Sequence, residues 1–236
     1  MAHFDLIAFD ADDTLWHSEN LYEAAENDFV EICSAYADDE RARAGLHQTE
    51  VSNLPLYGYG VKAFVLSMTE TLIGLSEGRA TAGEIARLVA RGKEMLSAEV
   101  HLLDGAAETL GELSHIFPLM VITKGDLGHQ ASKLARSGLA SFFKYVEIVV
   151  DKSPDVYREL LGKHGFDPQR VLMVGNSPRS DILPMLELGG WGVWVPYRIL
   201  WAHEHAHLSD DLGPRYREIE HIGDLPRLIR ELTAEL

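Results

Sequence analysis

The sequence contains a single cysteine, Cys33, among 236 residues. One cysteine excludes an internal disulfide and any metal site built from several thiolates. Cys33 lies in the apolar, helix-like run FVEICSAYA, which predicts a small buried side chain rather than a nucleophile. No apolar stretch has the length of a membrane span, and the first residues lack the pattern of a secretory signal. We therefore expect a soluble, cytoplasmic protein with no membrane partner.

Basic residues are also scarce, with 21 lysines and arginines against 37 acidic residues and a formal net charge of −16. This balance argues against nucleic acid or an anionic membrane as the main partner, because both are themselves polyanions. A small anionic ligand remains compatible, since a local site can be cationic within an acidic protein. Hydrophobic residues make up 46% of the chain, which is ample for a proper core.

Five short apolar runs predict buried parallel strands. Parallel strands covered on both faces are continuously hydrophobic rather than alternating, and a helical pattern follows most of these runs. Repetition of strand and helix at this spacing predicts an α/β fold with a Rossmann-like, doubly wound parallel sheet. The five runs are Phe4–Phe9, Leu119–Thr123, Val146–Val150, Val171–Val174 and Trp191–Val195.

The long interval between the first two runs has helical rather than strand patterns. We expect a Rossmann-like core, residues 1–16 and 101–236, and an inserted α-helical cap domain, residues 17–100, above the first strand tip. The tail after Pro196 is expected to be mostly loop and helix, with an amphipathic helix over residues 224–236. The helices predicted in the insert are Glu19–Tyr36, Val61–Ile73 and Ala82–Leu96, the last with Thr81 as its N-cap.

Three carboxylates follow the first predicted strand in the stretch FDADDTLW. The apolar run ends at Asp10, and Asp12, Asp13 and Thr14 follow at once. Like charges this close repel, so either a cation lies among them or one carboxyl keeps its proton. A helix N-cap or a loop pair would explain one of these aspartates but not three. Because ligands bind beyond the C-terminal ends of the strands in such sheets, we expect a ligand site here.

This stretch resembles motif one, hhhDxDxT, of the haloacid dehalogenase-like (HAD) superfamily. The other three motifs of that family are matched in order, each at the tip of a predicted strand. Thr123 in MVITKG matches motif two, Lys152 in VVDKSPDVYRELL matches motif three, and VLMVGNSPRSD, from Gly175 to Asp181, matches motif four. The motifs and the helical insert together cover essentially the whole chain. Asn176 departs from the pattern, since many relatives carry aspartate there.

The resemblance implies a Mg²⁺-dependent phosphomonoester hydrolase that acts on a small phosphorylated metabolite. Asp10 would attack phosphorus to form an aspartyl-phosphate, and Asp12 would act first as general acid and then as general base. Lys152 would complete the catalytic set by holding the phosphoryl oxygens. Thr123 is expected to bind the same oxygens through its hydroxyl.

Backbone N–H groups around Ala11 and Lys124 could add further phosphate contacts, and the Lys124 side chain could touch substrate. For Mg²⁺ the implied ligands are the hard oxygens of Asp10, Asp181 and the backbone carbonyl of Asp12, with Asn176 as a weaker, uncharged ligand. The sequence leaves open whether the protein is a monomer or a homodimer.

Other chemistries of the same family remain as alternatives. The 2-haloacid dehalogenases lack the second carboxylate of motif one, so Asp12 argues against that reaction. Phosphonatases use a cap lysine as a Schiff base, and Lys62 and Lys93 lie in the insert without a sign of a lowered pKa. A catalytically weak binding or regulatory protein is a further alternative. Asn176 is the only residue that suggests it.

We assign no catalytic or metal-binding role to two conspicuous patterns. The run HEHAH places His203, His205 and His207 in alternation, and we favour a solvated loop over a metal site. The run YGYG, residues 57–60, could gate a site or stack on a substrate ring, but a turn between two helices is the preferred interpretation.

Overall fold

The computed structural model describes residues 4–206 and 212–234, and the chain forms two compact units. The first unit comprises the residues up to His17, Val100–Lys124 and the chain from Gln130 onward. The second unit comprises Ser18–Glu99 together with Gly125–His129. Among the described residues, no helix combines the length and apolar character needed to span a membrane.

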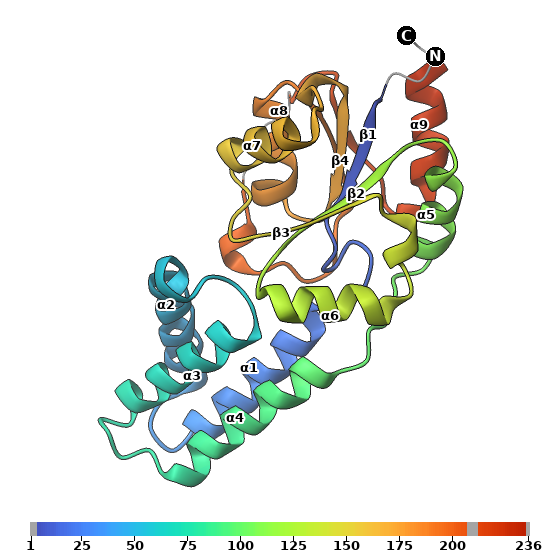
Figure 1. Ribbon diagram of the computed structural model, residues 1–236. Helices are drawn as coiled ribbons and strands as arrows, with labels where there is room; N and C mark the ends of the chain where they lie inside the picture. The colour runs from blue at the N-terminus through green and yellow to red at the C-terminus, as the bar shows by residue number, and fades with distance from the viewer. Residues whose placement is uncertain (1–3, 207–211, 235–236) are drawn as a thin grey trace. The chain divides into compact units, whose positions relative to one another are not determined.

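The first unit is built on a six-stranded parallel sheet with the order β3-β2-β1-β4-β5-β6 (Figure 1). This is the doubly wound α/β sheet that the sequence predicts. β1 lies centrally and pairs in parallel with β2 and β4. The residues that follow these three strands are therefore neighbours at the C-terminal end of the sheet. The strands are β1 Leu6–Phe9, β2 Leu119–Lys124, β3 Tyr145–Val149, β4 Val171–Gly175, β5 Trp191–Trp194 and β6 Tyr216–Glu218.

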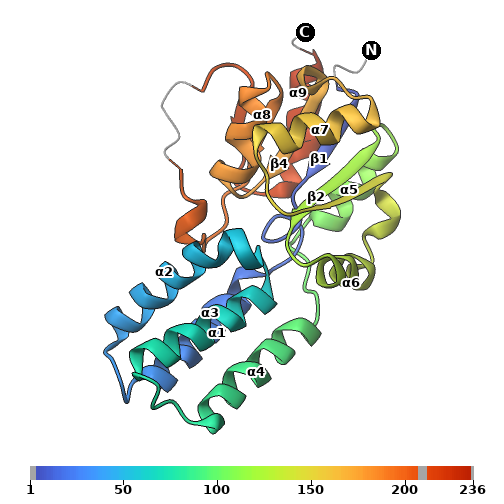
Figure 2. The same cartoon turned by 60° about the vertical axis from the view of Figure 1, so that its left-hand side comes forward.

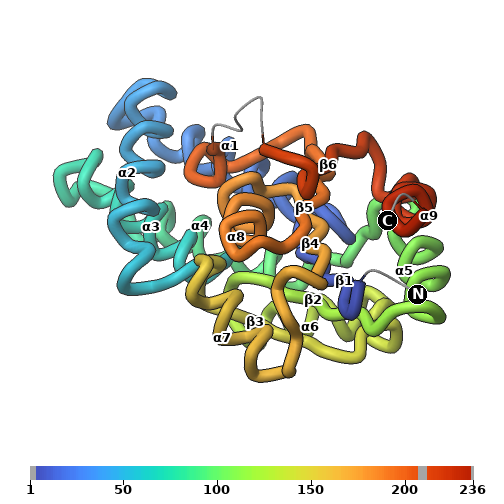
Figure 3. Tube along the Cα trace, turned by 90° about the horizontal axis from the view of Figure 1, so that it is seen from above, coloured from blue at the N-terminus to red at the C-terminus, as the bar shows by residue number. Residues whose placement is uncertain are grey.

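Hydrophobic side chains cover both faces of this sheet, which explains why its central strands are apolar throughout. Alternate residues of β1 enter two separate cores: Leu6 and Ala8 face one, Ile7 and Phe9 the other. Figure 3 shows helices on either side of the strands. α7 (Pro154–His164) and α8 (Leu183–Glu187) pack into the first core, and α5 (Ala106–Ser114) and α9 (Leu225–Ala234) into the second.

Five of the six strands coincide with the predicted apolar runs, and β6 was missed. It pairs in parallel with β5 at the sheet edge, with Tyr216 opposite Gly192. Its three residues YRE are half-buried or exposed, so no apolar run marks them in the sequence. The tail after Pro196 is mostly loop and helix, as predicted, and this three-residue strand is the exception.

The second unit is a bundle of four helices that run side by side (Figure 2). Three of them were predicted; α2 was not, because its charged sequence DERARAGLHQTEVSNLPLY has little amphipathic pattern. Asp38 caps its N-terminus by accepting a hydrogen bond from the Arg41 N–H, and Ala42 and Leu46 are buried against the bundle. The helices are α1 Glu19–Cys33, α2 Asp39–Tyr57, α3 Val61–Leu75 and α4 Ala82–Ser97.

Two local features that the sequence predicted in this unit, a helix cap and a buried cysteine, are present in the structure. Thr81 and Glu84 form a reciprocal capping box at the start of α4. Cys33 is buried at the end of α1, and burial raises the pKa of its thiol to about 11. Such a thiol is protonated at neutral pH, in agreement with a packing role.

The YGYG run forms a turn between α2 and α3, as preferred from the sequence. Gly58 and Gly60 have φ values of 68° and 112°, which favour glycine. A methyl group at Gly60 would also lie 3.3 Å from the backbone nitrogen of Asp126. Lys62 pairs with Asp126 at 2.9 Å, and these contacts explain why Gly125–His129 groups with the helices. The predicted division had placed that segment in the other unit.

Candidate active site

The polar residues after β1 are held in a tight loop. The carbonyl of Ala11 accepts hydrogen bonds from the N–H groups of Thr14 and Leu15, at 3.3 and 2.8 Å. Asp13 has a φ of 61°, a left-handed conformation that aspartate tolerates better than most residues. The loop returns Trp16 beside Asp12, where the two form an isolated bridge. Asp10, at the strand end, and Asp12, in the loop, are thereby fixed by backbone structure.

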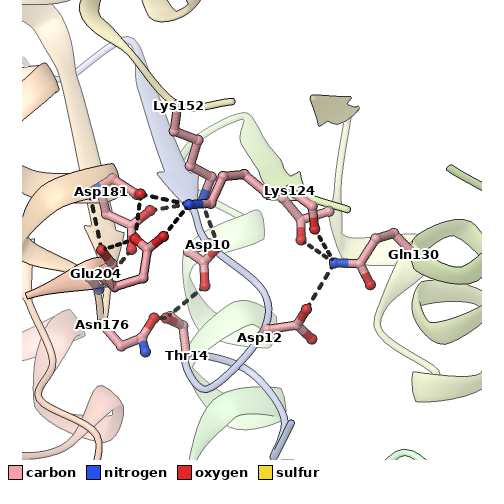
Figure 4. A network of polar contacts seen from close by, with 12 residues as sticks. Asp10, Asp12, Thr14, Lys124, Gln130, Lys152, Asn176, Asp181 and Glu204 are labelled. Atoms are coloured by element: carbon pink, nitrogen blue, oxygen red, sulfur yellow. Dashed lines mark hydrogen bonds and ion pairs between the residues drawn. The ribbon is translucent and has the colours of Figure 1, made fainter. Parts of the chain in front are cut away.

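Asp10 and Asp181 share one ammonium group. Lys152 Nζ lies 2.5 Å from Asp10 Oδ1 and 2.7 Å from Asp181 Oδ1 (Figure 4). Burial opposes the charge of Lys152, but the two carboxylates raise its pKa above the usual value. Burial raises the pKa of Asp10 to about 7, and Lys152 opposes that rise. The site therefore combines two buried carboxylates with one buried cation.

Short helical elements place both partners of Asp10. Lys152 directly precedes α7, whose start is set by Ser153 as N-cap and Pro154 in the first turn. Asp181 lies in a single wide helical turn, Pro178–Ile182, a conformation that often occurs at functional sites. Its Oδ2 accepts a hydrogen bond from the Ser177 N–H at 2.9 Å. A β-carbon at Gly175 would overlap the Asp181 carboxylate, which explains the glycine.

Oxygen donors for a hard cation are present beside Asp10. The Thr14 hydroxyl lies 3.2 Å from Asp10 Oδ2 and 3.4 Å from Asn176 Oδ1, so these two oxygens border the same space. Both oxygens of Asp181 accept hydrogen bonds, and so do both oxygens of Asp10. Each of these carboxylate oxygens keeps a second lone pair, so Asp181 and Asn176 both stay in the predicted ligand set beside Asp10.

No group of three or more histidine, cysteine, aspartate or glutamate side chains is arranged to hold a metal ion in the part of the chain that the structure describes. A cation here would combine the carboxylates of Asp10 and Asp181 with neutral oxygens, namely Asn176 Oδ1, the Asp12 carbonyl and water. Mg²⁺ accepts such a set, because it commonly binds through one or two carboxylates and keeps several waters. The residues present fit Mg²⁺ in this respect.

Asp12 is held by three donors from two segments. Lys133 Nζ and Trp16 Nε1 lie 2.5 and 2.6 Å from its Oδ1, and Gln130 Nε2 lies 2.8 Å from its Oδ2. Partial burial acts to raise the pKa of Asp12, but the Lys133 ammonium and the hydrogen bonds keep it below its usual value. The carboxylate is therefore ionised at neutral pH in this arrangement.

The end of β2 contributes Thr123 and Lys124. Gln130 Nε2 lies 2.7 Å from Thr123 Oγ1 and 2.7 Å from the Lys124 carbonyl, which ties both residues to Asp12. Figure 4 shows Gln130 between Lys124 and Asp12. The Lys124 side chain, in contrast, turns to Glu204, with Nζ 2.6 Å from Oε1.

Glu204 anchors the tail to the turn of motif four. Its carboxylate accepts hydrogen bonds from Ser177 and Ser180 in addition to the ion pair with Lys124. Burial acts to raise the pKa of Glu204, but Lys124 and the two hydroxyls lower it to about 2. This cluster links β2, the motif-four turn and the tail in one network.

The structure thus connects most of the predicted site residues. Asp10, Lys152, Asp181 and Asn176 belong to one network, and Asp12 and Thr123 belong to a second through Gln130. Lys124 is engaged by Glu204, and Ala11 contributes backbone only, with its side chain fully buried.

Sequence reasoning missed Gln130, Lys133 and Glu204. The first two are polar residues at buried positions of α6 (Leu127–Ser137), a departure from amphipathic pattern that could have revealed them. Glu204 gave no comparable signal, since it lies between the histidines of an otherwise polar run.

Those histidines make ordinary contacts. Arg179 Nη1 donates to the His203 carbonyl at 2.9 Å, and His205 Nε2 lies 3.2 Å from the Leu200 carbonyl oxygen. His207 lies outside the described residues.

Comparisons with known proteins agree with this fold. The family model of haloacid dehalogenase-like hydrolases matches residues 4–189. A haloacid dehalogenase-like family hydrolase from Xanthomonas campestris is 38% identical, with a TM-score of 0.88 over 99% of this chain and 93% of that one. No curated protein matches the sequence significantly.

More distant structures share the fold. A predicted phosphoglycolate phosphatase from Haemophilus somnus is 20% identical, with a TM-score of 0.63 over 97% of this chain and 99% of that one. A 2-haloacid dehalogenase from Pseudomonas syringae pv. tomato is also 20% identical, with a TM-score of 0.64 over 97% and 99% of the two chains. The family match, the 38% identical structure and the ordered motifs at the strand ends lead to one conclusion: the chain is a member of the haloacid dehalogenase-like hydrolase family.

Proposed function

We propose that this hydrolase cleaves small phosphomonoesters with Mg²⁺ as cofactor, through an aspartyl-phosphate on Asp10. The observation that carries the proposal is the second carboxylate, Asp12, held by three donors two residues after Asp10. Cleavage of a phosphate ester has a use for that group, because the leaving alcohol needs a proton. Displacement of halide does not, since halide leaves as a stable anion.

In the first step a carboxylate oxygen of Asp10 attacks phosphorus, and the bond from phosphorus to the ester oxygen breaks. The ester oxygen leaves with the bonding electrons and takes a proton from Asp12. Asp12 must therefore be protonated when substrate is bound, although its three donors favour the ionised form. An anionic phosphate ester brought next to it favours the protonated form, because like charges raise a carboxyl pKa.

In the second step water attacks the phosphorus of the aspartyl-phosphate and gives its proton to Asp12. The bond from phosphorus to the Asp10 oxygen breaks, which restores the Asp10 carboxylate and releases inorganic phosphate. Lys152 remains beside Asp10 throughout and can neutralise phosphoryl oxygens, and the Thr123 hydroxyl can donate to one of them. Bound Mg²⁺, held by Asp10, Asp181, Asn176 and the Asp12 carbonyl, would supply further neutralisation of phosphoryl charge.

The test is phosphate release from a panel of small phosphate esters, with and without Mg²⁺. We expect Mg²⁺-dependent release by the wild type and a loss of about 10³-fold or more in Asp10→Asn, since an amide is no nucleophile at phosphorus. Asp155→Asn is the matched control, because Asp155 is exposed on the same unit and should leave turnover unchanged.

Halide release from 2-chloropropionate is measured in parallel, because one structural relative is a 2-haloacid dehalogenase. Halide release without phosphate release would refute the proposal in favour of that reaction. Release of neither product would indicate a binding or regulatory protein.

A further inference from the structure

α6 presents two buried polar side chains, Gln130 and Lys133, to the site. They lie three residues apart, so they project from the same face of the helix. Gln130 is 3% exposed and Lys133 is 9% exposed, which is unusual for both residue types. Both side chains reach Asp12, one at each carboxylate oxygen. A buried ammonium is costly without a partner, so Lys133 and Asp12 stabilise each other's charge.

Gln130 joins the two strand ends that carry Asp12 and Thr123. Its Nε2 lies within 2.8 Å of Asp12 Oδ2 and within 2.7 Å of Thr123 Oγ1 and the Lys124 carbonyl. Its Oε1 has no hydrogen-bond partner among the described residues. The reversed amide would direct Oε1 at a carboxylate and a carbonyl, so the acceptors themselves determine which way this side chain points.

The same contact orients the hydroxyl of Thr123. The amide group has two hydrogens for three acceptors, but its nitrogen accepts no hydrogen bond, so the hydrogen of the Thr123 hydroxyl must point away from it. That leaves a donor at the end of β2 for an anionic oxygen. A single side chain on α6 thus acts on two site residues from different strands.

We propose that Gln130 and Lys133 are positioning residues for catalysis. Together they hold the Asp12 carboxylate in the orientation for proton exchange with the leaving oxygen and with water, and Gln130 also directs the Thr123 hydroxyl toward the phosphoryl group. The inference rests on the proposed phosphomonoester hydrolysis. Orientation of this kind matters because small displacements of a reacting group cost large factors in rate.

The test compares two esters whose leaving groups differ in their need for a proton. An alkyl phosphate needs a proton on its departing oxygen, whereas p-nitrophenyl phosphate leaves as a stable phenolate and does not. Single-turnover cleavage of both esters is measured for the wild type, Lys133→Met, Lys133→Arg and Gln130→Met, with exposed Lys163→Met as control. Single turnovers report ester cleavage alone, before water attacks the phosphoenzyme.

For Lys133→Met we expect about a 10²-fold slower cleavage of the alkyl ester and a change below about threefold for the aryl ester. Phosphoenzyme should accumulate with the aryl ester, because Asp12 also activates water. Lys133→Arg should recover much of the loss, since it restores a cation. Combining Lys133→Met with Asp12→Asn should add nothing to the loss caused by Asp12→Asn alone.

Gln130→Met, like Lys133→Met, should slow cleavage of the alkyl ester more than that of the aryl ester. It should also raise KM for both esters, since the Thr123 hydroxyl loses its orientation. This variant keeps the inference testable if Lys133→Met does not fold. Equal losses of the single-turnover rate at saturating substrate on both esters, or no loss on either, would overturn the positioning role while leaving the hydrolase proposal intact. Failure of the wild type to cleave either ester would instead overturn the proposed function, and this inference with it.

Discussion

Replacing Glu204 by glutamine should measurably destabilise the sheet unit at neutral pH. The Glu204 and Lys124 side chains are only 11% and 12% exposed, so solvent screens their ion pair little. A pKa of about 2 in the folded protein against 4.5 for an ordinary glutamate corresponds to about 3 kcal/mol of stability. Glutamine keeps one acceptor oxygen, so we expect a loss of about 3 kcal/mol in the free energy of unfolding, the lower end for breaking a buried ion pair.

The pH dependence follows from the direction of the shift. Because the folded pKa lies below the unfolded value, the contribution is fully present above about pH 4.5 and is lost as pH falls toward 2. The difference between wild type and Glu204→Gln should therefore be constant from pH 8 to about 5.5 and shrink at lower pH. At neutral pH the variant's melting temperature should fall by about 6–12 °C.

Tryptophan fluorescence during urea unfolding is a suitable assay. The protein has four tryptophans, Trp16, Trp191, Trp194 and Trp201, and all belong to the sheet unit, so the signal reports this unit alone. Exposed Glu159→Gln on α7 serves as control. A Glu204→Gln variant as stable as this control at pH 7 would refute the buried ion pair. If the loss of unfolding free energy in Glu204→Gln does not shrink at low pH, the electrostatic origin of the stabilisation is refuted.

Two further predictions concern the helical unit. Gly92→Ala in α4 should destabilise it by roughly 1 kcal/mol net, because the new methyl overlaps Val65 of α3. Gly74→Ala, where nothing lies within 4 Å, should stabilise it by about 0.5–1 kcal/mol; thermal melts followed by circular dichroism would test both, and equal effects would contradict the packing argument. The Cys33 thiol should resist iodoacetamide at pH 8 in the folded protein and react in urea, because it is buried with a pKa of about 11. Rapid labelling without denaturant would show that α1 opens locally.

Patterns confined to short stretches were predictable from the sequence. The central strands were recognisable because burial on both faces demands continuous apolar residues, as in β1 and β4. Thr81 was identifiable as a cap because its hydrogen-bond partner is three residues away. β6 and α2 were not predicted. A half-exposed edge strand needs no apolar run, and a weakly amphipathic helix is stabilised mainly by its neighbours.

The sequence by itself determined five strands of the sheet, three helices of the insert and the ordered set of motifs from Asp10 to Asp181, because apolar runs, helical periodicity and spacing along the chain encode them. Only the tertiary structure decided how those side chains are paired. Lys133 reaches Asp12 across 121 positions of sequence, and Glu204 reaches Lys124 across 80. Such partners leave no local pattern, because burial and complementary charge select them in space. Their selection determines which carboxylates the site keeps ionised.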